Sequence, residues 1–130
     1  MRVFKEKGFV RFQRKGHMSD EVLCKAVAKA RSGLIEADLG HGLIKQRAAR
    51  PGQGKRGSYR TIIAYRAKKR AVFLFGFAKS GKASLDADEL EALIKRGAVW
   101  IAASDAVIER AITTKELQEV DCGDEDEKQA

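Results

Sequence analysis

Hydrophobic positions near the start of the chain repeat with the period of a helix. Leu23, Val27 and Ala30 lie three or four residues apart, which predicts an amphipathic helix with one apolar face. Ser19 stands where the N-cap of that helix is expected. The run at positions 2–4 is expected to form a short strand that leads into an aromatic-rich first helix. The chain is therefore expected to open with a strand and two helices.

From Leu39 onward the pattern changes to that of β-strands. Three runs, 43–47, 59–66 and 71–77, are rich in β-branched and aromatic residues. The connections between them are short or turn-rich, which predicts an antiparallel meander of three strands. The third run is apolar on both faces and is expected to be the most buried strand. One face of the sheet is expected to be covered by helices.

A second helical region follows the strands. Asp86 and Glu89 have the spacing of a capping box, so a helix is expected to begin there. Ser104 is placed to cap a further short helix, and Thr113 with Glu116 is placed to start another turn. This order predicts an α+β domain in which N-terminal helices pack on a small, mainly antiparallel sheet and C-terminal helices follow.

The chain is long enough for one hydrophobic core, with 130 residues of which 44% are hydrophobic. Its charged N-terminus does not resemble a secretory signal, and no apolar run approaches the roughly 20 residues that span a bilayer. A soluble, cytoplasmic protein without a membrane is expected. Cys24 and Cys122 have neither the density of a secreted disulfide framework nor the spacing of a zinc site. Two reduced thiols and no metal are therefore expected.

The formal net charge of +8 is distributed very unevenly. Residues 1–82 carry 21 Lys and Arg against 5 Asp and Glu, a net charge of +16, whereas residues 83–130 carry 5 against 13, a net charge of −8. A region this basic attracts polyanions by neutralising phosphates and releasing their counterions. Nucleic acid is the partner class that this charge favours over a merely solvated basic surface.

Two other motifs do not support a different chemistry. Positions 76–82 match the phosphate-binding GxxxxGK pattern, but Ala83 follows where a P-loop needs Ser or Thr to ligate magnesium. We therefore expect an ordinary turn between a strand and a helix there. His17 and His41 each neighbour a glycine and are expected to be surface turn residues rather than catalytic groups.

Several cations lie on or beside the expected strands. Lys45 and Arg47 alternate along one strand and therefore share a face. Arg60 begins the next strand and Lys79 follows the third, so antiparallel pairing is expected to gather these side chains at one end of the sheet. Clustered cations at a partly buried edge are costly unless an anion completes the site. The alternative is an amphipathic sheet with ordinary outward-facing charges.

The same strands resemble a known family. The segments 43–47, 58–66 and 72–79 are similar to the basic strand, the Gly-Tyr-Arg-type strand and the apolar strand with a trailing cation of RelE-superfamily toxins. The HigB/RelE-like branch is the most similar, over about residues 2 to 100. The resemblance implies a cytoplasmic endoribonuclease that cuts mRNA, usually in the ribosomal A site, without a metal or other cofactor. It also implies a cognate antitoxin partner, expected to carry a helix-turn-helix DNA-binding domain.

The resemblance assigns roles to four cations. Lys45, surrounded by other positive charges, is expected to give up its proton readily and act as general base. Arg47 and Arg60 are expected to bind the phosphate, and Lys79 to protonate the leaving 5′-oxygen. Further residues are expected to bind RNA: Arg50, Lys55, Arg56, Tyr59 and Lys82.

Two departures from the family keep alternatives open. The tyrosine that well-studied members carry beyond the last strand is replaced by Leu85 and Asp86, and the catalytic histidine of some HigB toxins is missing. Tyr59 or Tyr65 is then the candidate for stacking on a base. ParE-like toxins use the same fold to inhibit DNA gyrase, so a protein-binding inhibitor is the first alternative and a passive RNA-binding protein the second.

The resemblance also suggests a division of the chain. Residues 1–103 are expected to form the RelE-like toxin domain, and residues 104–121 a C-terminal helical extension. Residues 122–130 are expected to form an acidic, disordered tail, because they offer almost nothing to bury.

Overall fold

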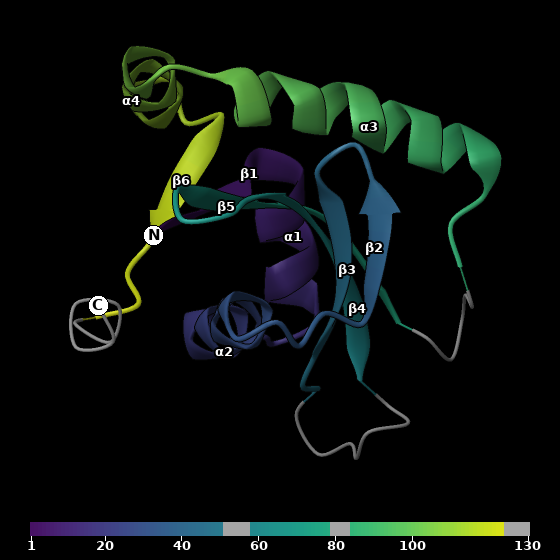
Figure 1. Cartoon of the computed structure of the whole chain (residues 1–130). Helices are drawn as coiled ribbons and strands as arrows, with labels where there is room; N and C mark the ends of the chain where they lie inside the picture. The colour runs from purple at the N-terminus through teal and green to yellow at the C-terminus, as the bar shows by residue number, and fades with distance from the viewer. Residues whose placement is uncertain (51–57, 79–83, 124–130) are drawn as a thin grey trace.

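The computed structural model of the chain describes residues 1–50, 58–78 and 84–123 (Figure 1). The elements are β1 (Arg2–Glu6), α1 (Lys7–Lys15), α2 (Asp20–Arg31), β2 (Ala37–Gly40), β3 (Leu43–Ala48), β4 (Tyr59–Arg66), β5 (Arg70–Ala78), α3 (Ala87–Ala102), α4 (Asp105–Thr113) and β6 (Leu117–Val120). The expected α+β class is confirmed.

The strands form one sheet in the order β2-β3-β4-β5-β1-β6. The neighbours pair antiparallel except β1 and β5, which are parallel. The predicted meander is β3-β4-β5, and its apolar third strand lies inside the sheet between β4 and β1. Strands β2 and β6, which form the two edges, were not predicted.

The helical turn expected after Thr113 is wrong, because the chain forms β6 there. Leu117 and Val120 lie three residues apart, a spacing that suits one face of a helix. In the sheet they point to opposite faces, as an odd separation requires in a strand. Accordingly, they are buried in two different clusters of the core.

Helices cover both faces of the sheet, so the expectation of one covered face is wrong. Figure 1 shows α3 along one side of the strands and α1 and α2 on the other. Alternation along β4 serves both layers: Ile63 packs in the cluster beneath α1 and α2, and Ile62 in the cluster beneath α3. Helix α3 contributes the buried side chains of Leu93 and Trp100 to that second cluster.

The predicted helix starts are confirmed by their caps. The Ser19 hydroxyl accepts a hydrogen bond from the Val22 amide at 3.3 Å. Asp86 and Glu89 form a reciprocal capping box at the start of α3. The Ser104 hydroxyl accepts from the amide of the third residue after it at 3.2 Å, which starts α4.

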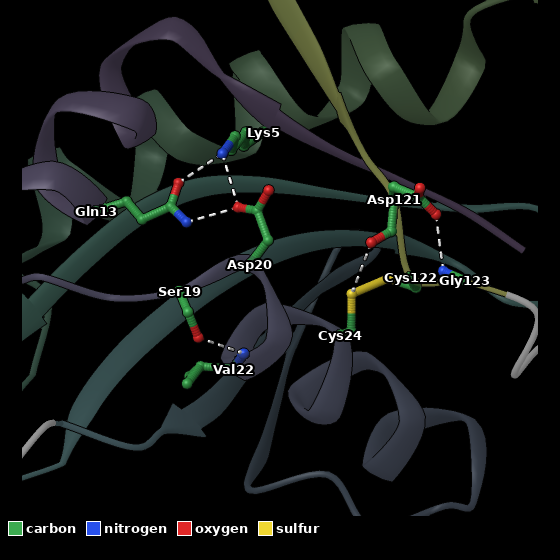
Figure 2. Close-up of a disulfide and its surroundings, with 9 residues drawn as sticks. All are labelled: Lys5, Gln13, Ser19, Asp20, Val22, Cys24, Asp121, Cys122 and Gly123. Carbon is green, nitrogen blue, oxygen red and sulfur yellow. Dashed lines mark hydrogen bonds and ion pairs between the residues drawn. A yellow bond between two sulfur atoms is a disulfide. The ribbon is translucent and has the colours of Figure 1, made fainter.

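The two cysteines form a disulfide, so the expectation of two reduced thiols is wrong (Figure 2). Cys24 lies on α2 and Cys122 directly after β6, and their Cα atoms are 5.6 Å apart despite a sequence separation of 98. Spacing arguments find zinc sites and dense frameworks, but they do not detect a pair that only the tertiary fold brings together. The tail beyond residue 123 lies outside the described residues.

Candidate active site

Three of the predicted catalytic cations lie on one face of the sheet. Arg47 on β3 and Arg60 on β4 are direct cross-strand partners. Lys45 shares the face of Arg47 by alternation, and both share it with Leu43, whose side chain packs in the cluster beneath α3. The cations therefore lie on the same side of the sheet as α3, as the alternation predicts.

Arg60 is the most enclosed of these cations, with only 3% of its surface exposed. Its Nε lies 2.8 Å from a carboxylate oxygen of Glu36, and its Nη1 donates to the carbonyl of Ser58 at 3.4 Å. A buried guanidinium needs such partners because desolvating a charge without compensation is costly. Glu36 therefore neutralises Arg60 and fixes the orientation of its planar group.

Lys45 and Arg47 lack that compensation. Arg47 is exposed and Lys45 half-buried. Neither forms an ion pair within the part of the chain that the structure describes. The face thus combines one fixed, neutralised arginine with two cations whose charge is available to an anionic ligand.

Glu36 was missed by the sequence analysis, and so was the residue that positions it. The Gln46 side chain accepts from the Glu36 amide at 2.8 Å and donates to the carbonyls of Ala26 and Leu34 at 3.0 and 3.1 Å. Gln46 is buried on the opposite face of β3 from its neighbours in sequence. The available signals were a polar residue at a core-facing strand position and one of the few acidic residues in the basic region.

A row across three strands completes the face. Arg47 pairs with Arg60, and Arg60 pairs with Phe77 on β5. Phe77 is 6% exposed and lies 6.1 Å from Phe75, measured between ring centroids. The aromatic residue that the fold places beside the arginines is therefore a phenylalanine.

Tyr59 and Arg50 lie elsewhere. Tyr59 is buried on the face of α1 and α2, where its ring packs edge-on against Phe12 with centroids 5.0 Å apart. Its hydroxyl also lies close to Gly16, where an added Cβ would approach within 2.8 Å. The Arg50 guanidinium stacks over the Tyr59 ring at 5.2 Å. Tyr65 packs against the same cluster as Tyr59, so the structure does not bring either tyrosine to the face of Arg47.

Four further predicted residues, Lys55, Arg56, Lys79 and Lys82, lie outside the described residues. The two histidines stand in turns with positive φ, 52° for His17 and 55° for His41, and both are exposed, which confirms them as surface turn residues. No group of metal-ligating side chains occurs among the described residues. Within those residues, too, none of the helices has the length and apolar character of a membrane span.

Other buried cations have structural partners. Arg70 donates to the carbonyls of Trp100 and Ala103 at the end of α3, at 3.0 and 2.8 Å. Arg96 on α3 donates to the Leu74 carbonyl at 2.9 Å and pairs with Glu6. These contacts attach α3 to the sheet and leave the row of Arg47, Arg60 and Phe77 as the separate chemical feature.

Figure 2 shows a third polar cluster, on the α2 side of the sheet. The buried Lys5 ammonium donates to Gln13 at 2.7 Å and to Asp20 at 2.8 Å, and Gln13 also donates to Asp20. Burial raises the pKa of Asp20, but the hydrogen bonds from Lys5 and Gln13 outweigh that effect and hold the pKa below its ordinary value. This cluster joins β1, α1 and α2.

The fold and the row of cations define a small α+β protein of the toxin class, and the comparison with known families agrees. The family model described as the RelE toxin of the RelE/RelB toxin-antitoxin system matches residues 1–120. The chain therefore belongs to this family and is a toxin of a toxin-antitoxin system. The match includes α4 and β6 as well as the strands on which the resemblance was based. The curated proteins contain no match to the chain.

Proposed function

We propose that the protein is a metal-independent endoribonuclease that cleaves mRNA on the ribosome and thereby inhibits translation. The observation that carries the proposal is the cross-strand pair of Arg47 and Arg60, with Lys45 on the same face. Two guanidinium groups and an ammonium group together suit a phosphodiester whose negative charge increases in the transition state. Family membership supports the same activity.

The reaction is a transfer of the phosphodiester within the RNA. The 2′-oxygen of a ribose forms a bond to the adjacent phosphorus, and the bond from phosphorus to the 5′-oxygen breaks. Lys45 accepts the proton of the 2′-hydroxyl, and the leaving 5′-oxygen takes up a proton from Lys79, which we propose from the sequence. The products are a 2′,3′-cyclic phosphate and a 5′-hydroxyl, and no oxidant or metal is needed for the balance.

The two arginines have different parts in this proposal. Arg47 is exposed and free to close on the phosphate with two parallel N–H donors. Arg60 is held by Glu36 through Nε, and no described residue accepts a hydrogen bond from its Nη2. Its Nη2 is therefore preoriented for a phosphate oxygen, which reduces the reorganisation required during the reaction.

A second candidate, a ParE-like inhibitor of a protein target such as DNA gyrase, is favoured by one observation. Both tyrosines pack into the core, so neither is presented for stacking on a base. Inducing the protein in growing cells and mapping transcript ends by primer extension separates the two functions. New 5′ ends within coding regions support the nuclease. Growth arrest with intact transcripts and DNA damage supports the inhibitor and rejects the nuclease.

A further inference from the structure

A groove of about 450 Å³ lies between α1 and the C-terminal elements. One wall is the exposed side of α1, and the other is formed by β6 and the end of α4. The groove is distant in the sheet order from the candidate active site, because β6 forms one edge whereas Arg47 lies on β3, next to the other edge. Helix α1 also covers the face opposite to the one that carries Arg47.

The rim of the groove is strongly basic. Lys7, Arg11 and Arg14 follow one another at positions i, i+4 and i+7 of α1, so they form a single stripe on one side of the helix. Lys115 faces them from the turn before β6. All four side chains are exposed, and none forms an ion pair with another described residue.

The acidic residue in the lining does not neutralise this rim. Both carboxylate oxygens of Glu119 accept hydrogen bonds from the Arg2 guanidinium, each at 2.9 Å. The charge of Glu119 is thus already compensated by a cation outside the groove. The rim therefore keeps an excess of four positive charges, which is unfavourable until a negatively charged ligand enters.

The floor of the groove is aliphatic. Val10, Ile112 and Leu117 lie between the cations, and no aromatic residue lines the groove. Val10 and Ile112 are partly exposed. RNA bound by its backbone gains from cations and from aromatic rings on which bases stack, and an aliphatic floor offers it little. Apolar side chains flanked by carboxylates match both the floor and the rim.

We propose that this groove docks an acidic amphipathic segment of a partner protein, with apolar side chains on Val10, Ile112 and Leu117 and carboxylates against the basic rim. Such a partner binds on the α1 and β6 side and leaves the row of Arg47 and Arg60 uncovered. The inference goes beyond the proposed ribonuclease activity and does not depend on it.

The test is a titration of isotope-labelled full-length protein, followed by the NMR shifts of its backbone amides. The probe is a synthetic 18-residue peptide with Leu on one helical face and Glu on the other, and a single-stranded oligouridylate of equal charge serves as the comparison. The expected result is saturable peptide-induced shifts in α1 and in residues 112–119. Arg11→Glu/Arg14→Glu is expected to weaken binding at least about tenfold, since each rim charge contributes to attraction. Val10→Ser is expected to weaken it about threefold, because it removes apolar contact.

Matched variants keep each outcome decisive. Lys68→Glu reverses an exposed charge in the turn between β4 and β5 and is expected to leave the affinity unchanged. Arg11→Gln/Arg14→Gln gives a milder change, should the charge reversal alter the circular dichroism spectrum. Equal weakening by Lys68→Glu, or no saturable shifts in the groove, would overturn the proposal. Oligouridylate binding in the groove with no effect of Val10→Ser would overturn it in favour of RNA.

Discussion

Arg47 and Arg60 face each other across β3 and β4 as directly paired residues of like charge. Opposed like charges destabilise a sheet unless something compensates them. Glu36 compensates Arg60, whereas Arg47 remains without an ion-pair partner in the described part of the chain. The arrangement is therefore stable in the free protein and ready to accept an anion.

Removing the compensating carboxylate is expected to cost stability. Glu36→Gln leaves the buried Arg60 guanidinium without its counter-ion and is expected to lower the free energy of unfolding by about 2 kcal/mol, because the uncompensated charge remains enclosed. Urea unfolding measures this change. Glu21→Gln, which breaks the exposed pair with Lys25, is the control and is expected to change the value by less than about 0.5 kcal/mol. A similar small effect at Glu36 would mean that Arg60 does not need this partner.

Truncating the exposed arginine is expected to act on catalysis and not on folding. Arg47→Ala removes a fork of donors from the phosphate and is expected to lower the rate of RNA cleavage roughly 10²–10³-fold. Its melting temperature is expected to stay close to that of the wild type, because the side chain is exposed. Arg14→Ala removes an equal charge on α1 and is expected to have little effect on the rate. Equal small effects of the two changes would indicate that charge alone is at work.

The disulfide is expected to be the largest single covalent contribution to stability. Because it closes a loop of about 100 residues, chain entropy predicts that its reduction lowers the free energy of unfolding by about 4 kcal/mol. Urea unfolding with and without dithiothreitol measures the difference. The control is Cys24→Ser/Cys122→Ser, in which the reductant is expected to change nothing. An unaltered wild-type midpoint after complete reduction would contradict the expectation.

The cluster of Lys5, Gln13 and Asp20 is expected to make stability depend on pH. The pKa of Asp20 is lowered in the folded protein, so its ionised form binds fewer protons than in the unfolded chain. Its contribution is therefore complete above about pH 5 and is lost as the pH falls through the lowered pKa. Unfolding followed between pH 2 and pH 6 is expected to show a shallower acid decline for Asp20→Asn than for the wild type. Parallel curves for the two proteins would contradict this role of Asp20.

Local patterns predicted the parts of the fold that depend on local physics. Ser19, Asp86 and Ser104 cap their helices as their neighbours in sequence suggest, because capping involves residues only three positions apart. The meander β3-β4-β5 followed from alternation and short connections. Strand β6 did not, because the spacing of Leu117 and Val120 is compatible with either a helix or a strand until β1 is placed beside it.

The site was predicted only in part for the same reason. Alternation is a local property, so it placed Lys45 and Arg47 on one face correctly. The pairing of Glu36 with Arg60 joins segments 24 residues apart through the fold of β2 on β3 and has no local signature. Tyr59 has the composition of a base-stacking residue, but the fold of α1 encloses it beside Phe12.

The central claim is that the paired arginines on β3 and β4 form a ribonuclease site. The most direct measurement is to map the 3′ ends of a defined mRNA after incubation with the purified protein in a reconstituted translation reaction without added metal chelator. The account predicts cleavage ending in a 2′,3′-cyclic phosphate with the wild-type protein, and a rate at least about 10²-fold lower with Arg47→Ala. Cleavage by Arg47→Ala at the wild-type rate, or intact mRNA with the folded wild-type protein, would contradict it.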